Sequence, residues 1–131
     1  MRTTLPKWQI ITGWILAAPI SGLLLFSASA KLTQPDGMAT DIAHLGWRMD
    51  QMRPIGIVEA SIVIIFLVPR TTVLGAVLIT GYMGGAMATH VRIDEPWITQ
   101  FLVGVIAWLS VFMRDPRVRE LLPIRRSQRI I

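Results

Sequence analysis

The chain has 131 residues, a formal net charge of +5 and no cysteine. Of its residues, 53% are hydrophobic and 16% are charged, whereas roughly a quarter of all residues are charged in soluble domains. The missing cysteine excludes disulfides, thiol redox chemistry, cysteine zinc sites and iron–sulfur clusters. Because the basic residues cluster outside the apolar segments, the positive charge indicates membrane topology and gives no reason to expect a nucleic-acid partner.

Four apolar segments predict membrane-spanning helices, at residues 8–30, 54–69, 71–90 and 96–113. A helix of a soluble fold needs a polar face, and these segments have almost none. Three of them reach the ~17–25 residues that cross a bilayer. Segment 54–69 is shorter, and we expect Pro54 in its first turn and Pro69 at its end. To cross the bilayer, this helix must be lightly tilted, extended over residues 50–53, or sheltered by its neighbours. The sequence therefore predicts one all-α domain over residues 1–131, an up–down bundle of four transmembrane helices.

The first segment also resembles a cleavable secretory signal. Arg2 and Lys7 precede an apolar stretch that ends in Ala28, Ser29 and Ala30. Its apolar part, residues 10–26, exceeds the ~7–15 residues of a signal core, so we expect this helix to be retained.

The connections predict orientation. Lys and Arg number nine on one side of the predicted bundle and four on the other, which favours both termini in the cytoplasm of a bacterial-type plasma membrane. The loop 31–53 then lies outside, where residues 38–47 are expected to form a short surface helix. Residues 114–131 form a basic cytoplasmic tail, explained by the same charge rule or by contact with anionic lipid headgroups or an acidic partner.

Small residues recur at one-turn spacing in the third segment. Gly81 and Gly85 form one such pair, and Gly84 and Ala88 form another. This spacing lets a neighbouring helix approach closely, so we predict packing within the bundle, with a second copy or a ligand as the alternatives. Replacing Gly85 by leucine is then expected to cost more than ~2 kcal/mol.

Several motifs together resemble a known family. They are Lys31-Leu32, His44-Leu45-Gly46-Trp47, Gly56-Ile57-Val58-Glu59, Pro69-Arg70, residues 78–92, Ala107-Trp108 and Arg114-Asp115. The succession resembles the DoxX-like family of small four-helix membrane proteins over nearly the whole chain. Its most specific part runs from Gly84-Gly85-Ala86 to Thr89-His90-Val91-Arg92. The resemblance implies the fold, and the family name derives from a subunit associated with a quinone-linked sulfur oxidoreductase; no catalytic residue set carries over.

Polar residues from all four predicted helices concentrate in the outer half. Glu59 is expected about five residues below the outer surface, ~8 Å along the helix. The other candidate ligand-binding residues are Lys31, Thr89, His90, Arg92 and Gln100. A carboxylate in the apolar layer costs perhaps ~2.5–3.5 kcal/mol, so it should pair, become protonated or line a polar cavity.

Three roles for this cluster follow. Glu59 pairs with Arg92 or Lys31, or bonds His90, and so stabilises the bundle. Alternatively the cluster binds a polar headgroup, a quinone or another small amphiphile. A proton or ion relay is disfavoured, because a pathway through the membrane would also need polar residues in the inner half of the bundle. The polar residues there are mainly Thr12, Thr80 and Ser110.

The remaining chemistry is sparse. His44 and His90 are the only histidines, and their expected positions do not favour haem. No phosphate loop, nucleophile–base pair or metal-ligand spacing occurs. The favoured function is a noncatalytic accessory subunit, or a module that binds a membrane protein, a second copy or an amphiphile. The alternative is the membrane component of a quinone-linked oxidoreductase, whose outer pocket holds the quinone while a partner carries the redox centres.

Overall fold

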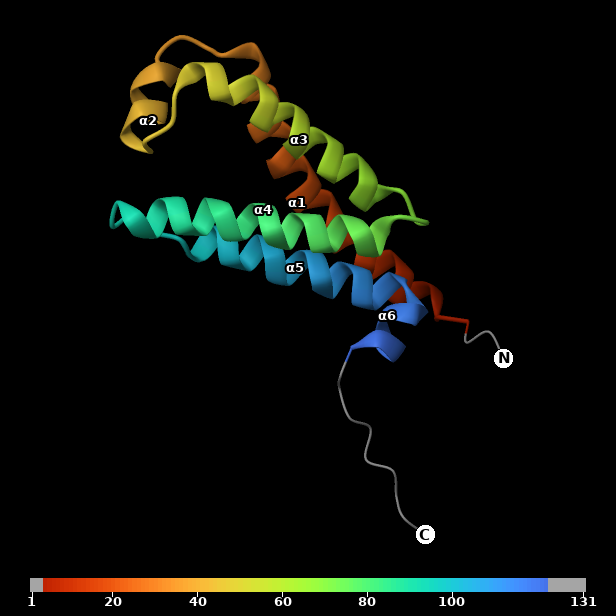
Figure 1. The fold of residues 1–131 in the computed structure, drawn as a ribbon. Helices are drawn as coiled ribbons and strands as arrows, with labels where there is room; N and C mark the ends of the chain where they lie inside the picture. Colours follow the sequence, from red (N-terminus) through yellow and green to blue (C-terminus); the bar gives the residue numbers. More distant parts are fainter. Residues whose placement is uncertain (1–3, 123–131) are drawn as a thin grey trace.

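The computed structural model describes residues 4–122, which contain six α-helices and no strand (Figure 1). The helices are α1 (Lys7–Thr33), α2 (Met38–His44), α3 (Met49–Leu67), α4 (Thr72–Arg92), α5 (Ile98–Arg114) and α6 (Pro116–Leu121). The all-α prediction is confirmed, and a short helix, α2, lies where a surface helix was expected. Of the predicted basic tail, residues 123–131 lie outside the described residues, and residues 116–121 form α6.

The four long helices pack in a ring. Helix α1 packs against α3 and α5, and α4 packs against the same two helices. Figure 1 shows α3 and α4 close together beside their connecting turn and diverging toward α2. We call the two ends of the bundle the α2 end and the α6 end. The divergence leaves the bundle wider at the α2 end.

Helix α3 begins earlier than its apolar segment. It starts at Met49, so Pro54 lies inside the helix, and the expectation of Pro54 in the first turn is wrong. The extension over residues 50–53 is the alternative that the structure adopts. The Gln51 side chain accepts a hydrogen bond from the Arg48 backbone N–H (2.9 Å), which satisfies a donor just before the helix. Helix α3 ends where expected, because Val68 is extended before Pro69.

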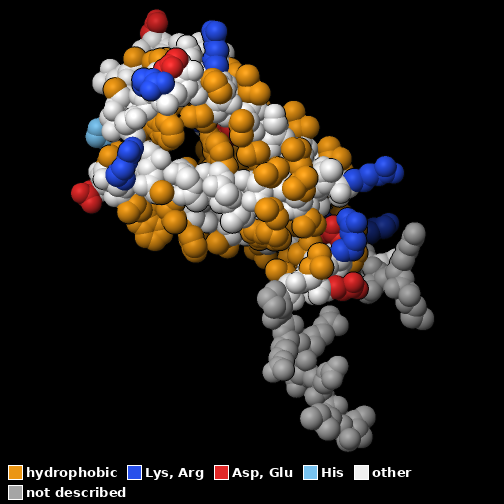
Figure 2. All heavy atoms as spheres, viewed as in Figure 1, with side chains coloured by type: hydrophobic (Ala, Val, Ile, Leu, Met, Phe, Trp, Pro, Cys, Tyr) orange, Lys and Arg blue, Asp and Glu red, His pale blue; other side chains and the backbone are white. Residues whose placement is uncertain are grey.

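The surface between the two ends is apolar. Phe26, Ile15 and Ile64 are 75%, 64% and 60% exposed, while Val63, Phe66 and Ala107 are fully buried in the core. Figure 2 shows hydrophobic side chains along the middle of the visible face, with Lys and Arg gathered toward the two ends. By length and composition, α1 and α4 could each cross a membrane, and α5 is apolar but has only 17 residues. An exposed apolar surface of this extent indicates contact with lipid or with another protein.

Three glycines allow the helices to approach closely. A Cβ at Gly75 would lie 2.5 Å from the Phe66 backbone nitrogen, and one at Gly13 would lie 2.9 Å from the Ser110 carbonyl oxygen. A Cβ at Gly56 would lie 3.1 Å from the carbonyl oxygen of Ala28. These positions bring together α3 with α4, α1 with α5, and α1 with α3.

The glycines predicted to pack are different ones. A Cβ at Gly81, Gly84 or Gly85 would meet no atom within 4 Å among the described residues, and Ala88 is exposed. The prediction that this face packs tightly within the bundle is therefore wrong for these three glycines, because in residues 4–122 no other helix comes within 4 Å of a Cβ placed there. Contact with a second copy or a ligand stays a prediction.

Helix α2 is tied to the turn between α4 and α5. The Arg92 Nη2 donates to the Leu45 carbonyl oxygen (2.7 Å), and His44 Nε2 lies 2.6 Å from Glu95 Oε1. These two contacts hold α2 and the residues after it across the wide end of the bundle.

Candidate functional site

A buried ion pair occupies the region where α1 crosses α3. The Lys31 Nζ donates to Glu59 Oε2 (2.8 Å), and the Glu59 side chain is only 2% exposed. Ser27 Oγ accepts from the same ammonium (2.5 Å) and lies 3.4 Å from the carboxylate. We call these three residues, together with Tyr82, the Glu59 site. Of the pairings expected for Glu59, the one with Lys31 is confirmed.

The local sequence places these groups together. Gly56 has no side chain, so α1 approaches α3 until the Lys31 Cβ would lie 3.0 Å from a Cβ at this position. Glu59 follows Gly56 by three residues and therefore lies on the same side of α3, facing α1. Ser27 and Lys31 are four residues apart on α1, so both face α3. Glu59 lies ten residues after the start of α3, about 15 Å along its axis.

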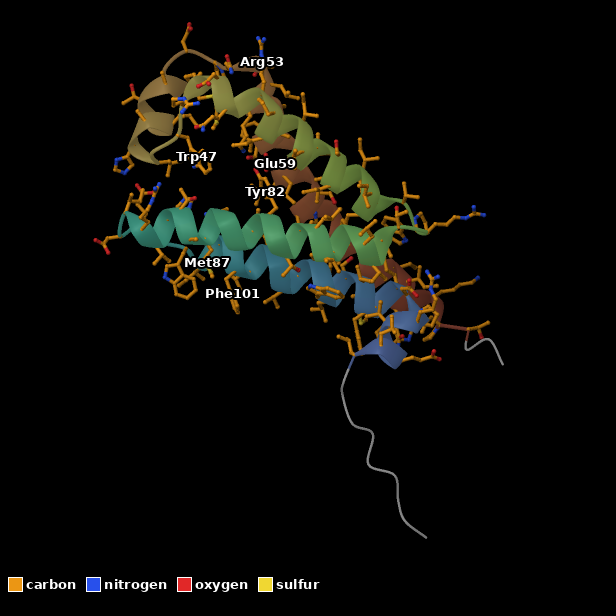
Figure 3. All side chains as sticks on the ribbon, viewed as in Figure 1. Trp47, Arg53, Glu59, Tyr82, Met87 and Phe101 are labelled. Carbon is orange, nitrogen blue, oxygen red and sulfur yellow. The ribbon has the colours of Figure 1, made fainter. Side chains whose placement is uncertain are left out.

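Tyr82, on α4, approaches Glu59 from a different side than Lys31 and Ser27, which lie on α1. Figure 3 shows its side chain pointing from α4 toward Glu59 across the space where α3 and α4 diverge. Figure 2 shows a hollow in the molecular surface at this place, with part of an acidic side chain visible at its edge. Trp47, labelled in Figure 3, lies on the α2 side of the same space. Glu59 thus has a protein partner on one side and an opening on the other.

The other predicted residues lie elsewhere. His90 Nδ1 lies 2.8 Å from the Ala86 carbonyl oxygen, and Gln100 Nε2 lies 3.3 Å from His90 Nε2, so these two residues form a separate pair between α4 and α5. Thr89 Oγ1 donates to the Gly85 carbonyl oxygen of its own helix (3.0 Å). Arg92 is engaged with Leu45. The structure therefore joins Lys31 to Glu59 and separates both from the other four residues of the predicted cluster.

Sequence reasoning missed two members of the site. Ser27 carried a usable signal, because it precedes Lys31 by four residues and so shares its helix face. Tyr82 is the one tyrosine of the chain and lies within the apolar third segment, where a hydroxyl needs a partner. Neither residue carries a charge, so neither stands out within an apolar helix.

The site offers one anionic acceptor and several donors. Lys31 has three N–H donors, of which two are used by Ser27 and Glu59. Tyr82 adds a hydroxyl that can donate or accept. Such an arrangement can hold a carbonyl, hydroxyl or phosphate group of a bound molecule, while the surrounding apolar side chains contact its hydrocarbon part.

A small helical bundle with an apolar exterior between two charged ends is the structure of a membrane protein. The sequence model of the DoxX-like family matches residues 14–113, and the chain belongs to this family. The resemblance noted in the sequence is thereby confirmed. No curated protein and no solved structure matches the chain.

Proposed function

We propose that this protein is a noncatalytic membrane protein that holds the polar head of an amphiphile at the Glu59 site. The observation that carries the proposal is the position of a buried carboxylate–ammonium pair beside an open hollow between α3 and α4. The head of the amphiphile hydrogen-bonds Lys31 and Tyr82, and its tail lies along the apolar surfaces of α3 and α4. The protein then serves as an accessory subunit that presents or stores this molecule.

The energetics of the ion pair support a role beyond packing. Taking two charges out of water costs several kcal/mol per ion, and an apolar replacement of similar volume is often as stable. A buried pair is therefore weak evidence for stabilisation alone. The Lys31 side chain keeps 18% of its surface exposed, so the pair is not fully enclosed by protein.

The proposal places four helices across the membrane, with the α6 end in the cytoplasm. Lys7, Arg70, Arg114, Arg117 and Arg119 belong to the α6 end, and Lys31, Arg48, Arg53 and Arg92 to the α2 end. Arg2, Arg125, Arg126 and Arg129 extend the first group in the sequence. Basic residues are retained on the cytoplasmic side of membrane proteins, which supports cytoplasmic termini.

Single cysteines test this topology, because the natural chain has none. We expect Asp36→Cys, in the connection before α2, to react with a membrane-impermeant maleimide in intact cells. Arg70→Cys, in the turn between α3 and α4, should react only after the membrane is opened. Labelling of Arg70→Cys in intact cells would contradict the orientation.

Quinone binding is the second candidate, and one observation favours it. Lys31 and Tyr82 present an N–H and an O–H donor beside a carboxylate, and these donors fit a quinone carbonyl. In this case the protein is the quinone-binding component of an oxidoreductase whose redox centres reside on a partner.

Native mass spectrometry of a mild detergent extract tests both candidates. We expect wild type to carry a bound lipid or quinone, and Tyr82→Phe, which removes one hydroxyl, to carry at least fivefold less at an unchanged melting temperature. Thr89→Val is the matched control, because this hydroxyl is bonded within its own helix. A bound quinone identifies the second candidate, and a bound lipid the first. If wild type and Tyr82→Phe carry equal amounts of ligand, or none, the Glu59 site only stabilises the fold.

A further inference from the structure

A second hollow lies at the opposite end of the molecule. It is a groove of about 830 Å³ between the start of α1, the turn before α4, and the junction of α5 and α6. Its lining combines apolar side chains, among them Ile10, Trp14 and Pro69, with the guanidinium groups of Arg114 and Arg117. Nothing in the proposed function uses this groove.

Arg114 is held in a fixed position in the groove. Its guanidinium carbon lies 4.2 Å from the centre of the Trp14 ring and 4.9 Å from that of Phe66. Its Nε donates to Ser110 Oγ (3.2 Å), and its Nη2 donates to the Phe66 carbonyl oxygen (3.3 Å). Ser110 in turn donates to the Gly13 carbonyl oxygen (2.7 Å). A guanidinium has five N–H donors, so three remain after these two bonds.

Arg114 forms no ion pair within residues 4–122. The remaining residues, 1–3 and 123–131, contain no aspartate or glutamate, so their side chains cannot neutralise it either. They add four arginines, Arg2, Arg125, Arg126 and Arg129. A partly buried charge without a partner is unfavourable, and an external anion would relieve it.

Two carboxylates, Asp115 and Glu120, also line the groove, and neither forms an ion pair with Arg114. Asp115 accepts two hydrogen bonds from the Arg117 side chain (3.1 and 3.0 Å) and one from the Arg117 backbone N–H (2.9 Å). These bonds hold the pKa of Asp115 below its usual range, so it is ionised and committed to Arg117. Glu120 is exposed on α6 and opposes an anion in the groove.

We propose that this groove binds the phosphate of an anionic phospholipid, with Arg114 as its main contact. The planar guanidinium matches the paired oxygens of a phosphate and is already oriented by Trp14, Phe66 and Ser110. Ile10 and Trp14, on α1, offer an apolar wall to the start of an acyl chain. The basic residues of the α6 end attract anionic headgroups to this surface. The occupant is a lipid because the groove joins a charged contact to the apolar exterior.

The test compares the binding of two lipids to the purified, full-length protein in neutral detergent. Phosphatidylglycerol and phosphatidylcholine are titrated, and bound lipid is counted by native mass spectrometry. We expect a preference for phosphatidylglycerol that falls about tenfold in Arg114→Gln, because the variant loses the charge and the paired N–H donors that bind the phosphate. Arg53→Gln, which removes an exposed charge at the α2 end, should keep the preference. Arg114→Lys should be intermediate, because lysine keeps the charge but not the planar fork.

Glu120→Gln should change phosphatidylglycerol binding in the opposite direction to Arg114→Gln, and it should leave the fold unchanged because Glu120 is exposed. Removing this carboxylate should strengthen phosphatidylglycerol binding severalfold, whereas Asp36→Asn at the α2 end should have no effect. If Arg114→Gln does not fold, this variant decides the question. Equal binding of both lipids by wild type, or no effect of Glu120→Gln, would overturn the proposal. Inorganic phosphate at millimolar concentration should not displace phosphatidylglycerol. Full displacement would show that the groove is a site for the free anion. Retention of an acidic protein in place of lipid would show that it is a protein interface.

Discussion

Replacing Glu59 by glutamine should lower the free energy of unfolding by about 3 kcal/mol. The substitution keeps the shape and one hydrogen bond of the side chain but leaves Lys31 without its counterion in an apolar environment. Breaking a buried ion pair typically costs ~3–5 kcal/mol. We expect the lower end, because the partly exposed Lys31 can turn its ammonium toward water. Reversible unfolding in mixed detergent micelles measures the change.

A double-mutant cycle identifies the partner of Glu59. Lys31→Met in the Glu59→Gln background should recover part of the loss, because no uncompensated charge then remains. Arg92→Gln is the matched control, since Arg92 is bonded to Leu45 and its effect should add to that of Glu59→Gln within about 0.5 kcal/mol. Additivity with Lys31 and coupling with Arg92 would show that the pairing in the structure is not the one that stabilises the protein.

Replacing Gly75 by alanine should lower the free energy of unfolding by about 3 kcal/mol. The added methyl group would meet the backbone of Phe66, which cannot move aside by a side-chain rotation. Overpacking costs ~1–3 kcal/mol where side chains can adjust, so a contact with backbone belongs at the upper end. The melting temperature in detergent and the yield of folded protein both report the change.

Gly85→Ala is the matched control for this prediction. It makes the same substitution in the same helix at a position where the new Cβ meets no atom within 4 Å. Alanine is favoured over glycine in a helix by about 1 kcal/mol, so this variant should be equal to or more stable than wild type. A large loss of stability in Gly85→Ala would show that a second copy or a bound molecule covers this face.

The sequence was sufficient to predict the helices but not their facing surfaces. Long apolar stretches bounded by proline and charge located the four main helices to within a few residues, because these signals are local. Spacing alone did not separate Gly75, which lies against Phe66, from Gly81 and Gly85, where a Cβ would meet no atom within 4 Å in the described part of the chain. Which side of a helix meets its neighbour depends on the packing of all four helices, and one-turn spacing occurs on any side.

The candidate site was predicted in part for the same reason. Glu59 and Lys31 stood out because charges are rare in apolar helices, and the structure joins them. The predicted cluster also included His90 and Gln100 because they lie at a similar depth, but the divergence of α3 from α4 leaves them as a separate pair. Arg114 belonged to a family motif and to the basic tail, but the sequence did not predict its environment, which is built from Trp14 and Phe66, residues distant in sequence.

The divergence of α3 and α4 gives the molecule a tapered shape. The two helices are in backbone contact near Phe66 and Gly75 and lie apart where α2 spans the wide end (Figure 1). In a bilayer, a tapered body occupies more area in the leaflet that holds its wide end than in the other. Deforming lipid around a protein costs free energy, and such costs sort proteins among membranes. With the four helices across the bilayer as proposed, we expect the taper to favour curved regions in which the leaflet around α2 is expanded, so that membrane curvature acts on this protein without any ligand.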